Sequence, residues 1–360
     1  MDIKNLDKNF AFDNAVKKGR HKVYTIPSNP FDLYGVYYNN EEGRFERIPL
    51  SVCKNANPAM QILYKHTSGG RIRFATDSSF IGINAKWNDR WNMCHMPLTG
   101  EAGFYLFEET KKGKKLIAGF RPDPHEEKGF FKSIKRPRKM TYYELYFPLY
   151  NEVLSLEIEL TEKATVKHGL PYKNVKPILY YGSSITQGGC ASRPDNSYQA
   201  FIEKWNNIDF INYGFSGAAK GEQAVIEYMA KTDCSVFVCD YDHNSDTPEL
   251  IERHFKVYET YRKYHPTTPF VIVTRPDYYT PTNKAALKWA RTAFAVIKET
   301  YDKAVAMGDK NVYFIDGRTF FNKQDRESCT VDGVHPNDLG FYKMAKGIYK
   351  KLVEIDEIFK

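Results

Sequence analysis

The sequence predicts an α/β protein in two parts, an all-β sandwich of jelly-roll-like pattern followed by a three-layer α/β/α domain with a parallel sheet. Residues 22–165 consist of short aromatic or β-branched runs punctuated by glycine, proline and asparagine, as in a sandwich. From residue 178 onward, short apolar runs alternate with amphipathic helices, the pattern of a parallel sheet with crossover helices. Two prolines and a glycine interrupt residues 167–177, and a chain of 360 residues suits two domains. We therefore expect domains at residues 1–170 and 171–360.

In the first part, strands are predicted at residues 22–26, 45–50, 71–75, 80–85, 103–108, 115–120, 141–147 and 153–160. The last of these has one wet face, because leucine or isoleucine at alternate positions is separated by serine or glutamate. The basic run at residues 111–115 has a central glycine and predicts a hairpin turn. The second basic cluster, residues 132–139, contains Pro137 and predicts a loop.

In the second part, strands are predicted at residues 178–181, 209–212, 235–239, 270–274 and 311–315. A helix is expected to begin at Thr247, with the threonine hydroxyl as its cap and Pro248 in its first turn. Apolar side chains at helical spacing predict two further helices, one over residues 284–306 and one from Phe341 to Ile355.

Polar segments follow four of these strands, at residues 182–186, 212–217, 240–244 and 332–336. Loops that follow the strands of a parallel sheet emerge at the same edge, so these segments are expected to converge. Ser184 follows a buried strand and would be held above that edge. A reactive serine there needs a base, an orienting carboxylate and donors for an oxyanion, and the other three segments offer residues of these types.

The four segments resemble the four blocks of the SGNH (GDSL-type) hydrolase family, over about residues 175–355, and the N-terminal part resembles the β-sandwich that precedes the catalytic domain in a subset of that family. The resemblance implies a serine esterase in which Ser184 is the nucleophile and His335 and Asp332 complete a triad. It further implies an oxyanion hole formed by Ser184, Gly217 and Asn244. Two residues depart from the family pattern: Ser183 replaces the usual aspartate, and Asp242 replaces the usual glycine two residues before the asparagine.

The chemistry explains why these residue types are needed. A serine hydroxyl must lose its proton as it attacks, and His335 can accept that proton and return it to the leaving alcohol. Asp332 can accept the other ring N–H and stabilise the imidazolium. No metal or other cofactor is expected, because Asp240, Asp242 and His243 are not joined by a second cluster of ligand residues.

The expected substrate is a short-chain acyl ester, with removal of acetyl groups from carbohydrate as the first choice. A lysophospholipase or thioesterase remains an alternative, and so does a catalytically silent carbohydrate-binding protein. Trp87 and Trp91 lie in a predicted loop, where they either contact the sugar or close one end of the sandwich. Asp242 and Val334 are the other predicted substrate contacts.

The composition limits the kinds of partner that this protein is expected to bind. The net charge of +8 comes partly from the two basic clusters, and neither carries a recognisable nucleic-acid motif, so no nucleic-acid partner is expected. No apolar run reaches the roughly 20 residues of a membrane span, and the polar N-terminus predicts a cytoplasmic protein without a membrane partner. The six cysteines are scattered and predict free, mostly buried thiols. The expected partner is a small-molecule or oligosaccharide ester, and a homo-oligomer is left open.

Overall fold

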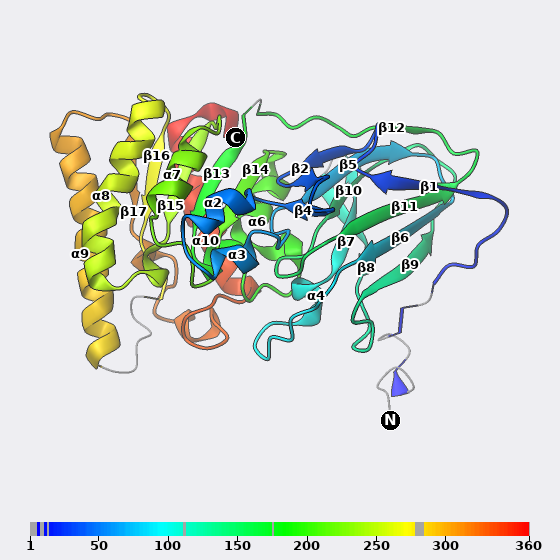
Figure 1. Ribbon diagram of the computed structural model, residues 1–360, viewed down its shortest axis with the longest axis horizontal. Helices are drawn as coiled ribbons and strands as arrows, with labels where there is room; N and C mark the ends of the chain where they lie inside the picture. The colour runs from blue at the N-terminus through cyan, green and yellow to red at the C-terminus, as the bar shows by residue number, and fades with distance from the viewer. Residues whose placement is uncertain are drawn as a thin grey trace.

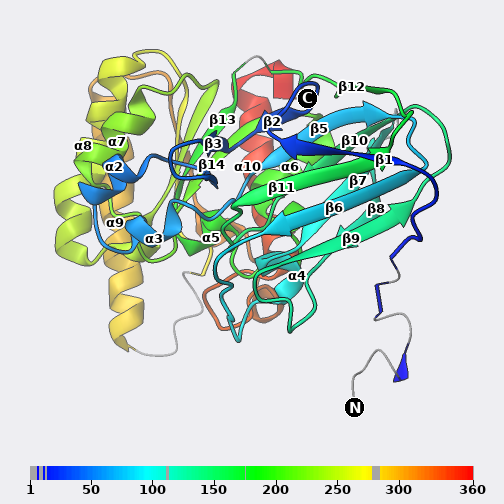
Figure 2. The same ribbon diagram turned by 45° about the vertical axis from the view of Figure 1, so that its right-hand side comes forward.

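The first part of the chain forms two antiparallel sheets that lie face to face (Figures 1 and 2). The computed structural model describes residues 6–7, 11–12, 14–110, 113–174, 176–277 and 284–359. One sheet has the order β1 (His21–Ile26), β11 (Ser155–Thr161), β6 (Phe80–Lys86) and β9 (Gly129–Lys135). The other has the order β12 (Val166–His168), β5 (Arg71–Thr76), β10 (Thr141–Tyr146), β7 (Phe104–Thr110) and β8 (Gly113–Phe120), and β2 (Asp32–Tyr34) also pairs with β5.

The core of the sandwich follows from the alternation of side chains along the strands. Leu156, Ile158 and Leu160 of β11 are fully buried and share one cluster with Ile83 of β6 and Phe74 of β5. Because alternate residues of a strand point to opposite faces, this set is the inner face of both sheets. The predicted sandwich and the predicted inner face of residues 153–160 are thereby confirmed.

Two local predictions for this part were wrong. Residues 45–50 do not form one strand: β4 (Arg44–Glu46) pairs only with β3 (Tyr37–Asn39), and Pro49 then precedes a helix. The basic cluster at 132–139 begins within β9 rather than in a loop. Its Lys132 is buried, which is possible because its ammonium group pairs with Asp123 and Glu126.

The predicted hairpin is present as the pairing of β7 with β8 through Thr110 and Gly113, while Lys111 and Lys112 lie outside the described residues. Three short helices interrupt the sandwich, α2 (Leu50–Lys54), α3 (Met60–Leu63) and α4 (Leu98–Glu101).

The second part is built on a parallel sheet of order β14-β13-β15-β16-β17. Its strands are β13 (Ile178–Gly182), β14 (Phe210–Gly214), β15 (Val236–Asp240), β16 (Phe270–Val273) and β17 (Val312–Ile315). Its helices are α5 (Ser184–Gln187), α6 (Tyr198–Asn206), α7 (Gln223–Ala230), α8 (Thr247–Tyr264), α9 (Lys284–Ala306) and α10 (Asp338–Ile355). Short 3₁₀ turns are η2 (Pro194–Asn196), η3 (Asp242–Asn244), η4 (Gly317–Thr319), η5 (Arg326–Ser328) and η6 (Glu357–Phe359).

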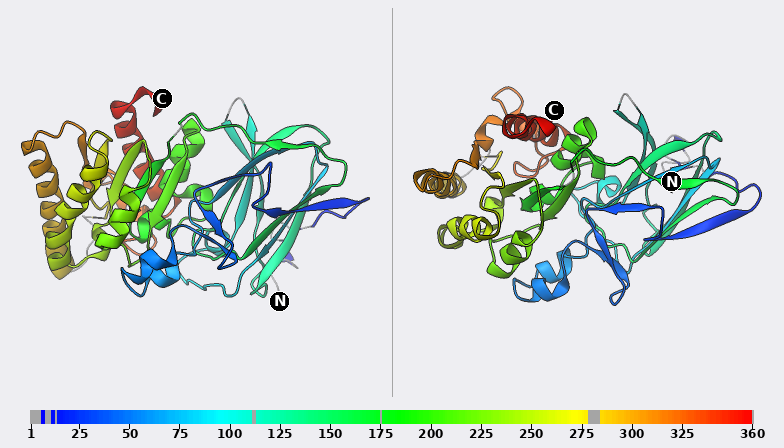
Figure 3. Two further views of the ribbon diagram at one scale, coloured as in Figure 1. Left: turned by 45° about the horizontal axis from the view of Figure 1, so that its top comes forward. Right: turned by 90° about the horizontal axis from the view of Figure 1, so that it is seen from above.

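Alternate residues of this sheet belong to two separate cores, which confirms the three-layer prediction (Figure 3). Tyr180 and Val238 pack with residues of α6 and α10 on one face. Leu179 and Phe237 pack with residues of α7, α8 and α9 on the other face. The strands are therefore apolar on both sides, as expected of a covered parallel sheet.

The helix ends follow local chemistry. Helix α9 spans Lys284–Ala306, as its apolar spacing predicts. The cap of α8 is Asp246 and not Thr247: its carboxylate accepts the Glu249 N–H, and the Glu249 side chain accepts the Asp246 N–H. This capping box satisfies two backbone donors at once, which a threonine hydroxyl one residue later does not do. None of the described helices is both long and apolar enough to cross a membrane.

The two parts share a buried interface. Helix α2 lies beside α7, with α3 next to α2 (Figures 1 and 2). Met60 and Leu63 of α3 belong to the same core as Val225 and Phe237. Farther along, Arg71 of β5 donates to the Phe210 carbonyl of β14. The sandwich therefore covers the β14 edge of the parallel sheet.

Candidate active site

Three strand ends form a level edge on which the polar segments meet. In the parallel register, Gly182 of β13 is paired with Gly214 of β14 on one side and with Asp240 of β15 on the other. A Cβ atom at Gly182 would lie 2.0 Å from Thr186 Oγ1 and 2.1 Å from the Asp240 carbonyl oxygen. Only glycine fits this turn, and the chain can then reverse into α5 directly above the sheet.

Ser184 is the first residue of α5. The Ser183 hydroxyl accepts the Ile185 N–H at 3.2 Å and so caps this short helix, a role that accounts for a serine where the family pattern has aspartate. Tyr150, from the sandwich part, donates its hydroxyl hydrogen to the Ser184 carbonyl at 3.1 Å. The nucleophile candidate is 8% exposed and is held from both parts of the chain.

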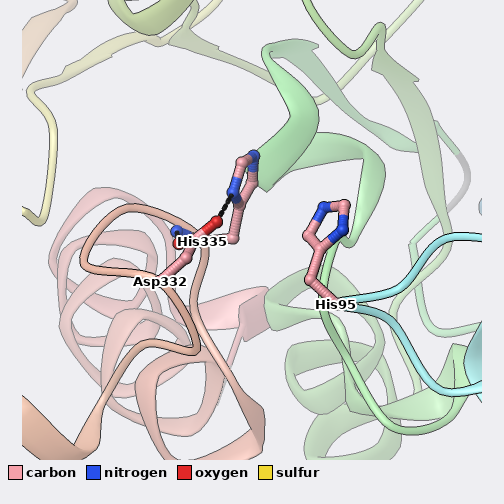
Figure 4. A group of neighbouring side chains, drawn as sticks. All are labelled: His95, Asp332 and His335. Atoms are coloured by element: carbon pink, nitrogen blue, oxygen red, sulfur yellow. Dashed lines mark hydrogen bonds and ion pairs between the residues drawn. The ribbon is translucent and has the colours of Figure 1, made fainter.

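A chain of hydrogen bonds runs from this serine to an aspartate. Ser184 Oγ lies 2.9 Å from His335 Nε2. On the other side of the ring, His335 Nδ1 lies 2.7 Å from Asp332 Oδ2, the bond drawn in Figure 4. The other oxygen, Asp332 Oδ1, accepts the backbone N–H groups of Val334 at 2.9 Å and His335 at 2.7 Å. This order of groups can take a proton from the serine and stabilise the resulting imidazolium.

The pKa of Asp332 fits this arrangement. Partial burial raises the pKa of this carboxyl, but the hydrogen bonds from the His335 ring and from two backbone N–H groups lower it more, so the net pKa lies below its usual value. Asp332 therefore remains a carboxylate, as a partner for imidazolium must.

The two other oxyanion candidates, Gly217 and Asn244, contact each other. Gly217 has φ +67, and its N–H donates to Asn244 Oδ1 at 3.1 Å. Asn244 Nδ2 donates one hydrogen to the Phe215 carbonyl at 3.0 Å, which leaves its second amide hydrogen for another acceptor. Ser184 N–H is at the first position of a helix, where no intrahelical acceptor exists. Gly217 and Asn244 are in contact, but the Gly217 N–H is bonded to Asn244, so the oxyanion hole formed by Ser184, Gly217 and Asn244 stays a prediction.

Asp242 does not face the site, contrary to the prediction that it contacts substrate. It is 1% exposed, and its Oδ2 accepts the Arg275 N–H at 3.3 Å. Burial raises the pKa of this carboxyl, with the charges of His243 and Arg275 opposing that rise. Asp242 therefore fixes the turn that carries Asn244, and this role explains a residue larger than glycine at the position.

The two tryptophans of the sandwich loop have different positions. Trp87 is 2% exposed in the sandwich core, and its indole N–H donates to the Glu127 carbonyl at 2.6 Å. Because this bond satisfies its only polar atom, the ring can be buried, and the prediction that Trp87 contacts substrate is wrong. Trp91 is 38% exposed and lies edge-on to His66, with ring centroids 4.8 Å apart.

Trp91 is connected to the catalytic edge through two side chains. His66 Nδ1 lies 3.2 Å from Gln187 Nε2, and Gln187 is the last residue of α5. Trp91 is thus linked through two buried side chains to the helix that carries Ser184. Val334 lies half-buried between Asp332 and His335 in sequence, and its contact with substrate stays a prediction.

Sequence reasoning missed His95, whose ring centroid lies 5.6 Å from that of His335 (Figure 4). It stands in a loop of the sandwich part and belongs to no motif of the second part. Donor atoms of His95, Asp332 and His335 lie within 4.8 Å of one another, as metal ligands can. Both His335 nitrogens and both Asp332 oxygens are already hydrogen-bonded, however, so a metal ion here would have to break the proton-transfer chain.

Fold and site together define the class of protein. The chain belongs to the GDSL-like lipase/acylhydrolase family, whose model matches residues 175–354, half of the 360 residues. Residues 22–166 match the model for the N-terminus of SGNH-hydrolase-type esterases. The protein is accordingly an ester hydrolase, and both expectations drawn from the sequence blocks are confirmed.

Solved structures share the arrangement of both parts. A Bacteroides ovatus protein described as a GDSL-like lipase has a TM-score of 0.83 at 28% identity, covering 93% of this chain and 98% of that one. The salicylyl-acyltransferase SsfX3 of a tetracycline biosynthetic pathway has a TM-score of 0.76 at 15% identity, and the match covers 93% of this chain and 97% of that one. A family two carbohydrate esterase from Clostridium thermocellum, solved with cellohexaose, has a TM-score of 0.58 at 14% identity, and the match covers 80% of this chain and 92% of that one. The last two show the shared fold. Among curated proteins, none matches the chain significantly.

Proposed function

We propose that this ester hydrolase is a serine esterase that removes short acyl groups, acetyl above all, from carbohydrate alcohols. The observation that carries the proposal is the hydrogen-bond chain from Ser184 Oγ through His335 to Asp332 at the carboxyl edge of the sheet. Its three members come from two distant segments, and an ordered chain of this kind has little use other than activating the serine.

In the proposed reaction, Ser184 Oγ attacks the ester carbonyl carbon while His335 Nε2 takes the hydroxyl proton. The negative charge on the former carbonyl oxygen is stabilised by the Ser184 N–H and the free amide hydrogen of Asn244. The C–O bond to the alcohol then breaks as His335 gives its proton to the alcohol oxygen. Water repeats the sequence on the acyl-enzyme, releasing the acid and restoring the serine.

The carbohydrate part of the proposal is supported by one side chain and by one structure of the same fold. Trp91 offers an exposed aromatic face in a sandwich loop that is linked to α5 through His66 and Gln187, and such a face is suited to stacking on a sugar ring. The family two carbohydrate esterase solved with cellohexaose shares the two-part fold.

Two measurements test the proposal. After treatment with a fluorophosphonate probe, mass spectrometry should find the adduct on Ser184. Ser184→Ala should lose activity, whereas Ser183→Ala should still be labelled on Ser184. An ester panel from acetyl to octanoyl nitrophenyl esters, with acetylated oligosaccharides, should show rates that collapse with chain length. Octanoyl cleavage as fast as acetyl would favour the lysophospholipase alternative, and labelling at Ser183 would refute the assignment.

A further inference from the structure

We infer that His95, a residue of the sandwich part, contacts the alcohol portion of the ester at the moment it leaves. The inference rests on the proposed function, because it assigns a recognition role at the same site. It concerns the leaving group and not the acyl group, since His95 lies beside His335, the residue that must return a proton to the alcohol oxygen.

His95 is an exposed side chain on an anchored backbone. Met96, the next residue, is 5% exposed in the core that contains α6 and α10, and Met93 packs against the same core. The Met93 N–H donates to Glu101 Oε2 at 3.2 Å. With Met96 buried in this core and Met93 packed against it, the backbone holds the imidazole out toward solvent at a fixed place.

The helix that follows is also tied to the catalytic part. In α4, Thr99 Oγ1 donates to the Ser192 carbonyl at 2.6 Å. A Cβ atom at Gly100 would lie 2.1 Å from the Ala191 carbonyl oxygen, so the two backbones are in close contact. The segment 188–192 directly follows α5, which carries Ser184. The position of His95 is therefore coupled to that of the nucleophile.

The spacing between the two imidazoles suits one oxygen atom. In Figure 4 the His95 ring lies across His335 from Asp332, with ring centroids 5.6 Å apart, and a His95 nitrogen lies within 4.8 Å of a His335 nitrogen. A hydroxyl oxygen with hydrogen bonds of about 2.8 Å can join two atoms up to roughly 5.6 Å apart. A hydroxyl oxygen placed between the two imidazoles can therefore be within hydrogen-bond reach of both.

This placement predicts an effect on acylation that depends on the alcohol. An alkyl or sugar alcohol leaves only when protonated, and a contact from His95 would orient it toward the His335 proton. Nitrophenolate leaves without that proton, and during deacylation a water molecule occupies the alcohol position. Loss of His95 should therefore weaken turnover of alkyl esters more than that of nitrophenyl esters.

The test compares His95→Ala and His95→Gln with His168→Ala, which removes another exposed imidazole from the sandwich part. The substrates are an acetylated sugar, ethyl acetate and 4-nitrophenyl acetate, with thermal melting as the check on folding. For His95→Ala we expect kcat/KM on alkyl and sugar esters to fall about tenfold, and at least threefold further than on the nitrophenyl ester. His95→Gln, which keeps a hydrogen-bond donor, should recover part of the loss, and His168→Ala should match the wild type.

Equal losses on all three esters, or none on the alkyl esters, would overturn the inference. The result also separates it from the sugar proposal. A wild-type enzyme that cleaves ethyl acetate but no sugar acetate would refute the sugar substrate. The loss of kcat/KM in His95→Ala on ethyl acetate, compared with its loss on 4-nitrophenyl acetate, would still decide the role of His95.

Discussion

Replacing Asp332 by asparagine tests whether the aspartate sets the protonation of His335. The asparagine oxygen can keep the two backbone hydrogen bonds from Val334 and His335 that Asp332 Oδ1 accepts at 2.9 and 2.7 Å. Its NH₂ group then faces His335 Nδ1, where a carboxylate oxygen accepts at 2.7 Å in the wild type. The ring must accept at Nδ1 and carry its proton on Nε2, so it presents N–H to Ser184 and cannot take the serine proton.

The expected loss follows from this tautomer change. We expect kcat to fall by about 10³–10⁴, equivalent to ~4–5.5 kcal/mol of transition-state stabilisation, with little change in KM or in the melting temperature. The assay is steady-state hydrolysis of 4-nitrophenyl acetate. Asp338→Asn is the matched control. Asp338, at the start of α10, accepts the Ser192 N–H at its Oδ1 atom at 2.8 Å and has no part in the proton path. A kcat within tenfold of the wild type in Asp332→Asn would refute the reasoning.

Three other predictions concern the rest of the site and the interface. Asn244→Ala should lower kcat by about 10²–10³ with a smaller change in KM, and an unchanged kcat would move the oxyanion donor elsewhere. Trp87→Ala should lower the free energy of unfolding by about 3–5 kcal/mol, because its ring is buried in the sandwich core. Trp91→Ala should leave the melting temperature almost unchanged and reduce activity on sugar esters selectively. Equal melting temperatures of the two variants would contradict this contrast. Burial raises the pKa of the Glu144 carboxyl, but the charges of Lys114 and Arg73 lower it more, so its net pKa lies below the usual 4.5. The ionised carboxylate therefore stabilises the folded protein above pH 4.5, and this contribution should be lost as the pH falls below that value. Thermal melting of Glu144→Gln should show a weaker decline below pH 4.5 than the wild type, and parallel declines would count against the pairing of Glu144 with Lys114 and Arg73.

The strand ends of the catalytic part could be predicted because each motif follows a short, fully apolar run. The resemblance of the four polar segments to the family blocks then singled out Ser184, Asp332 and His335, and sheet topology predicted that these segments meet at one edge. Those features depend on local pattern, which a single sequence contains.

What the sequence could not supply are contacts between residues far apart in the chain. Trp87 and Trp91 stand in one loop and look alike in sequence, yet only the Glu127 carbonyl, 40 residues away, makes burial of the first possible. The fully buried Arg47 and the exposed His95 carry no motif at all, and their roles depend on where the sandwich docks. A cap such as Asp246 was within reach of sequence reasoning, because Glu249 three residues later completes the capping box.

The position of Arg47 bears on how such a two-part enzyme could be divided or recombined. Its guanidinium donates to the Asn212 carbonyl at 3.1 Å and to the Gly214 carbonyl at the end of β14, although Arg47 belongs to the sandwich part. A catalytic part expressed alone would expose these carbonyls, together with the apolar surface that Met60 and Leu63 cover. Gene fusions or swaps that keep residues 171–360 but replace the partner would therefore need a substitute for this arginine, and the two parts should be inherited as one unit.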